Sequence, residues 1–427
     1  MLWHLTVLEN GFIGIFMVPL LSFNRFEKVP RVAIYANWWL IFRIMIGSGL
    51  IKIRGDQCWR DLTCMDYHYE TQPVPNPLSF YLHHNYSSFH KLETIVNHIV
   101  ELITPWFMFL SRDLRIMNGM FQIVFQLILI SSGNLSFLNW LTILPSLCFL
   151  DDQFLTKWFP MFYNSEMRKK YGDHDATSTS SKTAFSLVEW LGYLIRFIKD
   201  AGFALLVLYL SVPVVRNLLA LDGHQHMNTS FDTFKIVNTY VHLYTQTLNN
   251  LYVCLSSNSS SLSHSRYGAF GSITKVRTEV IFKGTNDDIM SIRDKSKIVW
   301  KEYEFKCKPG DVNRRPCLIS PYHYRLDWLL WFAAFGDYNQ HPWILHLTWN
   351  LLKGRNEAKD VYDLIQFDPF YNQTKAPKFI KADHYEYKFA PWNHKDKKAW
   401  WVRKYLKEYF PPLSLDNKSL KKFLGKS

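Results

Sequence analysis

The sequence predicts an α-helical multi-pass membrane bundle of about six spans, followed by an α+β lumenal domain. The bundle is predicted by the way apolar residues gather in the first half, where residues 116–150 contain no Asp, Glu, Lys or Arg. A single span needs roughly 20 apolar residues, so this run holds two. The second domain is predicted by strand-like alternation of apolar and polar residues at Thr278–Lys283 and Lys301–Lys306.

Composition agrees with a membrane protein and argues against a nucleic-acid-binding one. The chain has 427 residues, 16 Trp and a formal net charge of +13. No zinc-finger spacing, aromatic RNA-binding box or basic helical block accompanies this charge. The positive residues instead flank the apolar segments, as they do on the cytosolic side of membrane spans.

The expected membrane domain covers residues 1–220 and consists of spans joined by loops. Residues 116–150 are divided at Ser131–Asn134, where a tight turn forms easily, and residues 185–198 are expected to lie on the membrane surface. A lumenal loop over residues 55–91 and a cytosolic loop over residues 151–200 complete the domain. The spans are expected at about residues 1–21, 34–53, 92–110, 116–131, 135–150 and 201–215.

Basic flanks and glycosylation sequons give the same sidedness. The basic residues of Arg25–Arg31 and Arg112–Arg115 should face the cytosol. Counting crossings then puts the 55–91 loop and everything after the sixth span on the lumenal side. A further sequon at Asn134 lies in the tight turn, where modification is not expected. The lumenal glycosylation candidates are Asn85, Asn228, Asn258, Asn372 and Asn417.

The remaining chain is expected to form a linker over residues 221–266 and a lumenal C-terminal domain over residues 267–427. The linker is rich in serine. Besides the two strands, the domain is expected to contain helices at residues 326–335, 343–352 and 397–409.

The sequence lacks the common catalytic signatures. It has no Gly-x-Ser-x-Gly elbow, His-Glu-x-x-His, Walker loop, Gly-x-Gly-x-x-Gly or Cys-x-x-Cys. We therefore expect no enzyme of these types, no metal and no cofactor. Asp66, His68 and Glu70 would share one face of an extended strand and could bind a metal, but a solvated face is the preferred interpretation.

Four of the six cysteines are disulfide candidates. Cys58 and Cys64 bracket a short segment of the expected lumenal loop, and Cys307 and Cys317 bracket a turn sequence. Free thiols or cross-pairing remain alternatives, because four cysteines allow three connectivities. Cys148 is expected to pack as a small apolar residue.

Ionisable residues in the spans have two interpretations each. Lys52, at the end of the second span, could be a base with a lowered pKa, but a lysine that snorkels to the interface is preferred. His98 and Glu101 could form an intramembrane binding pair, but a structural hydrogen bond is preferred. Arg43 in mid-span must be paired or face a polar interior.

The second half also contains a dense group of polar and aromatic residues. Tyr, Trp and Arg are favoured anchors at protein interfaces, and they also make ordinary contacts at the edge of a core. The sequence leaves both interpretations open. The resulting client-binding candidates are Arg314, Arg315, Tyr322, Tyr324, Arg325 and Trp328.

Several long strings resemble the lipase maturation factor family. The most recognisable is IRGDQCWRDLTCMDYHYETQPVPNPLSFY at Ile53–Tyr81. Further matches lie at Ser132–Asp152, Tyr267–Gly284, Trp300–Phe335 and Tyr387–Trp392. Glu9–Phe12 resembles an internal position of the family, so the chain is expected to be N-terminally short.

This resemblance implies a multi-pass endoplasmic-reticulum membrane protein with a large lumenal C-terminal domain. Members of the family assist the folding, assembly and maturation of secreted homodimeric lipases as chaperone-like factors, not as hydrolases. The implied partners are the lipid bilayer and unfolded or assembling lipases.

A more remote resemblance supplies the alternative function. The membrane half is similar to the membrane domain of vitamin K-dependent carboxylases, in which a lysine shortly before an Asp and a Trp acts as a base. Lys52 precedes Asp56 and Trp59 in the same way. By this resemblance the chain would be a membrane enzyme that uses Lys52 as its base.

Overall fold

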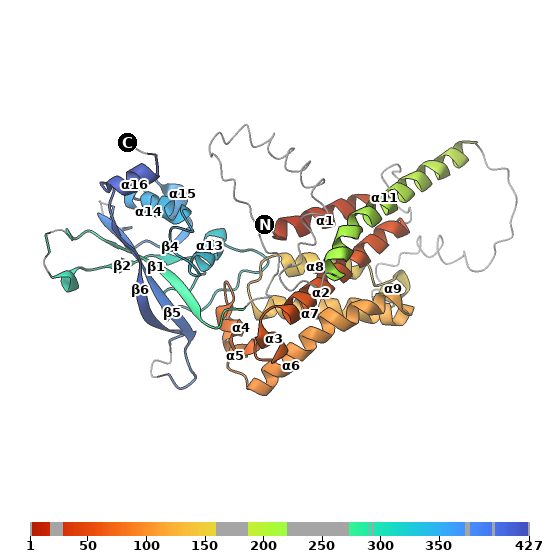
Figure 1. The fold of residues 1–427 in the computed structure, drawn as a ribbon, viewed down its shortest axis with the longest axis horizontal. Helices are drawn as coiled ribbons and strands as arrows, with labels where there is room; N and C mark the ends of the chain where they lie inside the picture. The colour runs from red at the N-terminus through yellow and green to blue at the C-terminus, as the bar shows by residue number, and fades with distance from the viewer. Residues whose placement is uncertain are drawn as a thin grey trace. The chain divides into compact units, whose positions relative to one another are not determined.

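The computed structural model divides the chain into two compact units that are interleaved along the sequence (Figure 1). Unit 1 comprises residues 1–60, 95–127 and 138–272, and unit 2 comprises residues 61–94, 128–137 and 273–427. The structure describes residues 2–17, 29–158, 187–219, 273–289, 291–292, 294–371, 376–394 and 398–425.

The described secondary structure of unit 1 is helical. Its core joins α1, α2 and α11 through Ile13, Leu40 and Phe203, and a second cluster surrounds Ile41 and Met45 of α2. Its helices, two of which begin or end in unit 2, are α1 (Leu2–Met17), α2 (Arg31–Arg54), α3 (Gln57–Arg60), α6 (Ser87–His98), α7 (Arg112–Ser132), α8 (Leu138–Leu147), α9 (Asp152–Trp158) and α11 (Leu187–Leu219).

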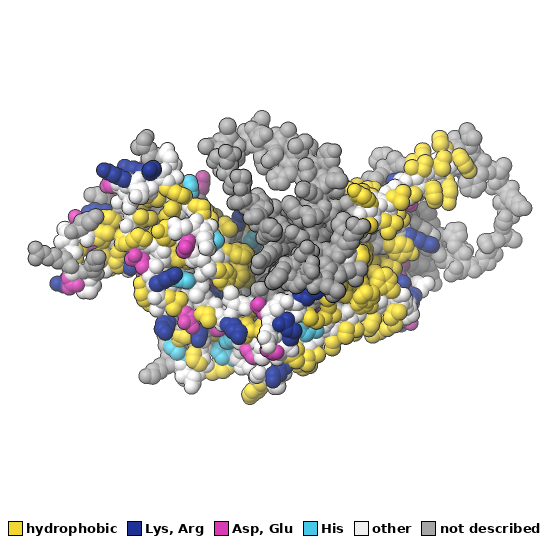
Figure 2. Space-filling view, viewed as in Figure 1, with side chains coloured by type: hydrophobic (Ala, Val, Ile, Leu, Met, Phe, Trp, Pro, Cys, Tyr) yellow, Lys and Arg dark blue, Asp and Glu magenta, His cyan; other side chains and the backbone are white. Residues whose placement is uncertain are grey.

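Two described helices, α2 and α7, are long and apolar enough to cross a membrane. Pro30 precedes α2, and Gly55 follows its last residue. Figure 2 shows many hydrophobic side chains on the outer surface of the helices, as a lipid-facing surface requires. Arg43 is buried within α2, in agreement with the expectation that it faces the interior.

The six expected spans are not confirmed. The segment expected at 92–110 is not one α-helix, because a π-helix (Ile99–Ile103) and a 3-10 helix (Thr104–Phe109) follow α6. Pro105 lies at the start of the 3-10 helix, where its missing N–H prevents a continuous α-helix. The expected surface helix at 185–198 and the expected span at 201–215 form one helix, α11.

Unit 2 contains a four-stranded antiparallel sheet with strand order β2-β1-β5-β6 and a two-stranded sheet of β3 and β4. The central pair runs from Arg277 opposite Tyr387 to Thr285 opposite Phe379. The strands are β1 (Arg277–Thr285), β2 (Lys301–Glu302), β3 (Glu304–Phe305), β4 (Ile365–Phe367), β5 (Phe379–Phe389) and β6 (Trp401–Leu413). The helices are α4 (Met65–Thr71), α5 (Pro77–His83), α13 (Arg325–Ala333), α14 (Trp343–Lys353), α15 (Lys359–Tyr362) and α16 (Lys418–Phe423).

Successive side chains of a strand point to opposite sides of the sheet. Most side chains of β1 are buried, so this strand is covered on both faces. Val280 and Phe282 enter the core formed with Leu330 of α13 and Ile344 of α14. Ile281 enters the opposite cluster, which includes aromatic residues of α4, α5, β5 and β6. Segments from the 61–94 loop therefore cover one face of a sheet that belongs to the C-terminal half.

The C-terminal secondary structure was predicted in part. The strand at 278–283 is confirmed as β1, and the helices at 326–335 and 343–352 as α13 and α14. The single strand expected at 301–306 is split between β2 and β3, which belong to different sheets. The helix expected at 397–409 is wrong: Lys and Glu favour a helix locally, but residues 401–413 pair with β5 as an edge strand.

Arg277 at the start of β1 joins the 61–94 loop to the sheet. Its side chain is fully buried and all five N–H groups are used. Nη1 donates to the carbonyls of Glu70 (2.8 Å) and Gln72 (2.5 Å), and Nη2 donates to that of Pro73 (3.0 Å). Nε and Nη2 also donate to Oε1 of Glu279, at 2.9 and 2.6 Å.

The 131–134 turn is joined to the same loop. Gln72 Nε2 and Ser79 Oγ both donate to the carbonyl of Ser132, at 3.2 and 2.7 Å. A Cβ on Gly133 would lie 2.0 Å from the Gln72 side-chain oxygen, so any other residue here would displace the Gln72 amide. Three separate stretches of sequence thus form one compact unit through buried polar contacts.

We predict that Arg277→Lys lowers the stability of unit 2 strongly. Lysine keeps the charge but cannot replace the planar set of donors, and breaking a buried ion pair costs about 3–5 kcal/mol. The midpoint of thermal unfolding of the purified protein in detergent should therefore fall. Arg355→Lys, at an exposed pair with Asp363, is the matched control and should change stability by about 0–1 kcal/mol. Equal effects of the two substitutions would contradict the assigned role of Arg277.

Candidate functional site

A disulfide-closed loop in unit 2 forms a candidate site. Cys307 and Cys317 are joined, with their Cα atoms 5.6 Å apart. Asp327, in the first turn of α13, accepts hydrogen bonds at Oδ1 from the N–H groups of Cys307 (2.9 Å) and Lys308 (2.7 Å). Burial raises the pKa of the Asp327 carboxyl. One buried carboxyl group therefore fixes the loop onto the helix that follows it.

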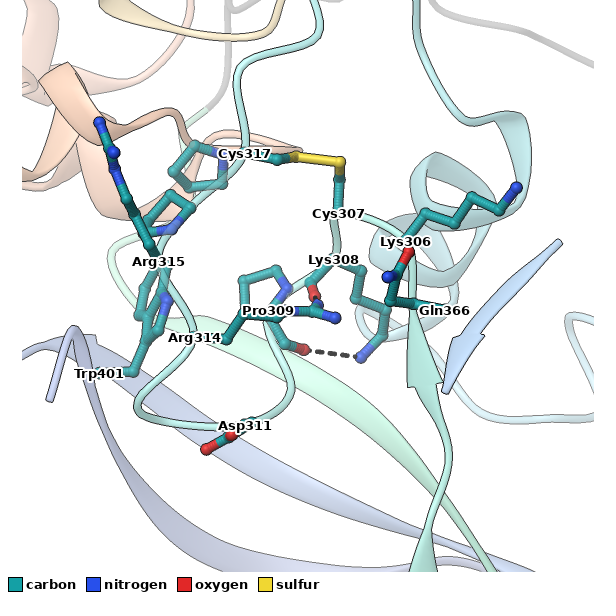
Figure 3. A pocket seen from close by; sticks show the side chains of 12 residues that line it. Lys306, Cys307, Lys308, Pro309, Asp311, Arg314, Arg315, Cys317, Gln366 and Trp401 are labelled. Carbon is teal, nitrogen blue, oxygen red and sulfur yellow. Dashed lines mark hydrogen bonds between the residues drawn. A yellow bond between two sulfur atoms is a disulfide. The ribbon is translucent and has the colours of Figure 1, made fainter. Parts of the chain in front are cut away.

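The loop surrounds a cavity of about 210 Å³. In Figure 3 the disulfide lies above the cavity, with Trp401 on one side and Asp311 below. A more open cavity of about 520 Å³ adjoins it and shares Asp311, Arg314 and Gln366. The two cavities present both charge signs, because Lys306, Arg315 and Arg403 lie on their walls together with Glu302 and Glu304.

The two neighbouring arginines of the loop have different surroundings. Arg314 points inward, where Nη1 donates to the carbonyl of Phe305 (2.7 Å), Nη2 donates to that of Lys308, and Nη1 lies 3.3 Å from Glu304. Arg315 is exposed and points away from Arg314 (Figure 3). Arg314 therefore holds the loop together, whereas Arg315 is available at the rim.

The aromatic client-binding candidates lie in one chain of ring contacts. Tyr322 contacts Tyr324 with 5.2 Å between ring centroids, and Trp328 is 5.9 Å from His323. The ammonium of Lys306 lies 5.3 Å from the Tyr324 ring centroid. Arg325 is exposed at the first position of α13. The structure thus brings together residues that the sequence could only group by proximity in the chain.

The sequence did not identify the network behind this loop. Oε1 of Glu279 accepts from Arg277, and Oε2 lies 2.9 Å from the Lys308 ammonium. Arg277 and Glu279 are two residues apart on β1, so they share one face of the strand. Both residues lie in the segment Tyr267–Gly284, which resembles the family. No sequence pattern predicted that Lys308 would contact Glu279.

The glycosylation and cysteine candidates have diverse environments. Asn85 is exposed just after α5, whereas Asn417 caps α16 by accepting from Leu420 N–H at 3.1 Å. Asn134, which was not expected to be modified, is fully buried and hydrogen-bonded to the Cys317 carbonyl and the Ile319 N–H. Cys58 and Cys64 are disulfide-bonded, and Cys148 is a free thiol. Three glycosylation candidates lie outside the described residues: Asn228, Asn258 and Asn372. Cys254 also lies outside them.

In unit 1 the snorkelling expected for Lys52 is wrong. Lys52 is buried, and its ammonium donates to Glu101 Oε1 (2.6 Å) and Asn97 Oδ1 (2.9 Å). Asn97 in turn donates to Glu101 Oε2 at 3.0 Å. The ammonium also lies 4.8 Å from the Trp59 ring centroid. His98 is not the partner of Glu101, because its Nε2 bonds with the Trp59 carbonyl at 3.0 Å.

Asp66, His68 and Glu70 lie on helix α4, so the extended strand considered for them is not formed. Among the described residues no group of three or more His, Cys, Asp or Glu could hold a metal. Glu70 is buried instead of solvated, and it accepts from the N–H of Phe389 at 3.1 Å. Its other neighbour is His83, 3.5 Å away.

Two helices that are long and apolar enough to cross a bilayer, together with a disulfide-containing α+β unit, indicate a membrane protein with a folded second unit. Two family models match the chain. The model described as lipase maturation factor transmembrane domain covers residues 1–157. The model described as lipase maturation factor C-terminal domain covers residues 263–411.

Full-length relatives agree with these matches. Lipase maturation factor 1 of Mus musculus is 47% identical over 97% of this chain and 66% of its own length, and that of Homo sapiens is 46% identical over 97% and 67%. Lipase maturation factor 2 of Xenopus laevis is 27% identical over 99% and 67%. No solved structure matches the chain. The chain belongs to the lipase maturation factor family, and it spans about two thirds of the length of these relatives.

We predict strong coupling between Lys52 and Glu101. Lys52→Met leaves a buried carboxylate without its partner, and such a loss costs about 3–5 kcal/mol. The double variant Lys52→Met, Glu101→Met removes both charges and should recover much of the thermal stability in detergent. If the stability losses of the two single variants simply added up in the double variant, a structural ion pair would be contradicted.

We predict that acidification destabilises unit 2 through His83. Burial lowers the pKa of His83 from 6.5 to about 4, with smaller effects from His84 and His90. A neutral His83 therefore stabilises the fold above pH 6.5, and this contribution is lost as the pH falls toward 4. The raised pKa of Glu70 acts in the opposite direction.

The measurement compares the thermal midpoint at pH 7.5 and pH 5.5 for the parent chain and for His83→Asn. The variant should lose less stability on acidification, by at most about 1.4 kcal/mol per pH unit. His346→Asn, at an exposed position of α14, is the control and should follow the parent. A parent-like pH dependence in His83→Asn would refute this role.

Proposed function

We propose that the chain is an endoplasmic-reticulum membrane factor that assists the folding and assembly of secreted lipases, including homodimeric ones. The observation that carries the proposal is the identity of 46–47% over almost the whole chain to proteins named lipase maturation factor 1. Those names support a role in lipase maturation. They designate a maturation factor and not a reaction, which supports a non-catalytic role.

The composition of unit 2 supports a lumenal location for the C-terminal domain. The crossing count expected two segments on the same side of the membrane, the 55–91 loop and the chain after the sixth span. Unit 2 brings together parts of both, residues 61–94 and 273–427, with residues 128–137. A disulfide in the same unit fits an oxidising compartment.

The rim of the disulfide loop is the proposed client-binding surface. Arg315 and Lys306 line the cavity without an acidic partner among the described residues. Tyr322 is exposed nearby in sequence, and Tyr324 contacts Lys306. Arginine and tyrosine supply cationic and amphipathic contacts that suit the partly exposed apolar and acidic surface of an unassembled protein. Binding such a surface would hold it away from aggregation until the native dimer forms.

The alternative of a membrane enzyme has no support from the comparisons, since neither the matched models nor the relatives are named for such a reaction. The surroundings of Lys52 also favour a scaffold. Its ammonium, the Asn97 amide and the Glu101 carboxylate hydrogen-bond one another in a closed set. A general base would have to leave this set to reach a substrate.

We predict that the double variant Lys306→Glu, Arg315→Glu reduces lipase maturation. Reversing charges at a rim opposes the approach of an acidic client surface and slows association. Cells that lack their own maturation factor would co-express each variant with a secreted homodimeric lipase, and secreted activity per lipase molecule would be measured. We expect a severalfold loss at equal levels of the membrane protein.

The matched control is Lys404→Glu, Lys407→Glu on the exposed side of β6. It makes the same change in net charge away from the cavity and should leave secretion unchanged. If the cavity variant matured the lipase as well as this control, the proposed binding surface would be wrong.

A further inference from the structure

Helix α13 and the segment before it carry an apolar surface that shares only Tyr322 with the proposed client-binding surface. We define the α13 surface as Leu318, Tyr322, Leu329, Phe332 and Phe335. Leu318 is 72% exposed, Tyr322 62% and Phe332 49%, and the other two are also exposed. Ring contacts connect it, since Trp331 lies 4.8 Å from Phe332 and 4.7 Å from Phe335. Exposed apolar surface of this extent marks a protein or membrane contact.

The helix carries apolar residues on its buried side and also on an exposed side. Its inner side places Leu330 and Ala333 in the core of unit 2. Its outer side presents Leu329 and Phe332, three residues apart on one face. A helix on the surface of a water-soluble domain would have polar residues there. The outer side of α13 therefore needs an apolar environment of its own.

Hydrogen bonds connect this surface to the end of a membrane span. The N–H of Ile319 donates to Asn134 Oδ1 at 3.0 Å, and Asn134 Nδ2 donates to the Cys317 carbonyl at 2.8 Å. Ser136 Oγ and His323 Nδ1 are 2.9 Å apart. The segment that carries Leu318 and Tyr322 is thus held against residues 134–136.

Residues 133–137 are the connection between α7 and α8. Helix α7 ends at Ser132 and is long and apolar enough to cross a membrane, so this connection must lie at the membrane boundary. The segment that carries Leu318 and Tyr322 is hydrogen-bonded to this connection, so it lies at the same boundary. The segment before α13 therefore lies beside the end of a helix that is long and apolar enough to cross a membrane.

The chemistry of the surface also fits the boundary of a bilayer. Tyr and Trp prefer the headgroup region, where the ring is partly apolar and partly hydrated. Arg325 is exposed at the start of the same helix, where a guanidinium can bind phosphate oxygens. Apolar residues on one side of a helix with a cation at its edge are typical of helices that lie in the interface.

We infer that the α13 surface binds the lipid bilayer, so that unit 2 lies on the membrane and is not only tethered to it. Leu329, Phe332 and Phe335 enter the boundary between headgroups and acyl chains, and Arg325 contacts lipid phosphates. The rim at Arg315 is three residues from Leu318, so a client bound there would also meet the bilayer surface. This inference depends on the membrane spans and not on the proposed client.

The test places a fluorescent label on the full chain in phosphatidylcholine–phosphatidylserine nanodiscs. The label is attached at Phe332→Cys in a background with Cys148→Ser and Cys254→Ser. Interfacial helices bury their apolar side roughly 5–10 Å deep, so nitroxide lipids labelled near the headgroup should quench the label about twofold. A label at Lys422→Cys on α16, which is exposed, is the control and should not be quenched.

Absence of lipid quenching at position 332 would overturn the inference. An emission shift that occurs only after a secreted lipase is added would also overturn it, because the surface would then be a client site. Leu329→Cys provides the same measurement if Phe332→Cys does not give a monodisperse protein. Lipid quenching at either position with none at Lys422 supports the inference.

Discussion

The structure of unit 2 depends on the buried guanidinium of Arg277. Five hydrogen bonds join one side chain of β1 to three carbonyl groups of the 70–73 backbone and to Glu279. Buried carbonyl groups without donors are costly, so the loop and the strand depend on each other. Lys308 extends the network into the disulfide loop through Glu279. The candidate site therefore rests on the same residues that close the fold.

This dependence explains why a loop between two membrane helices and a distant C-terminal half form one unit. The aromatic residues of α4 and α5 cover one face of the sheet, and the 131–136 turn bonds with both the loop and the disulfide segment. The membrane helices and the extramembrane unit are thus connected at several points of the sequence.

The ionisable groups of both units serve structure more clearly than catalysis. Lys52, Asn97 and Glu101 hydrogen-bond one another, and Glu279 forms buried ion pairs with Arg277 and Lys308. A catalytic group needs a partner that it can release, whereas breaking a buried ion pair is expensive. The residues left at the surface, such as Arg315 and the aromatic side chains of α13, are the ones suited to binding. This distribution supports a binding function for a family named for maturation.

The sequence by itself determined the helical and α+β halves, the strand β1, the helices α13 and α14, and the family, because these depend on local pattern and on long strings of residues. Only the tertiary structure decided that residues 401–413 form a strand, since their partner β5 lies at a distance and non-local pairing overrides local helix preference. It also decided the partner of Lys52, which lies 49 residues away. The same holds for the role of Arg277, whose acceptors are backbone carbonyls that carry no signal in the amino-acid sequence.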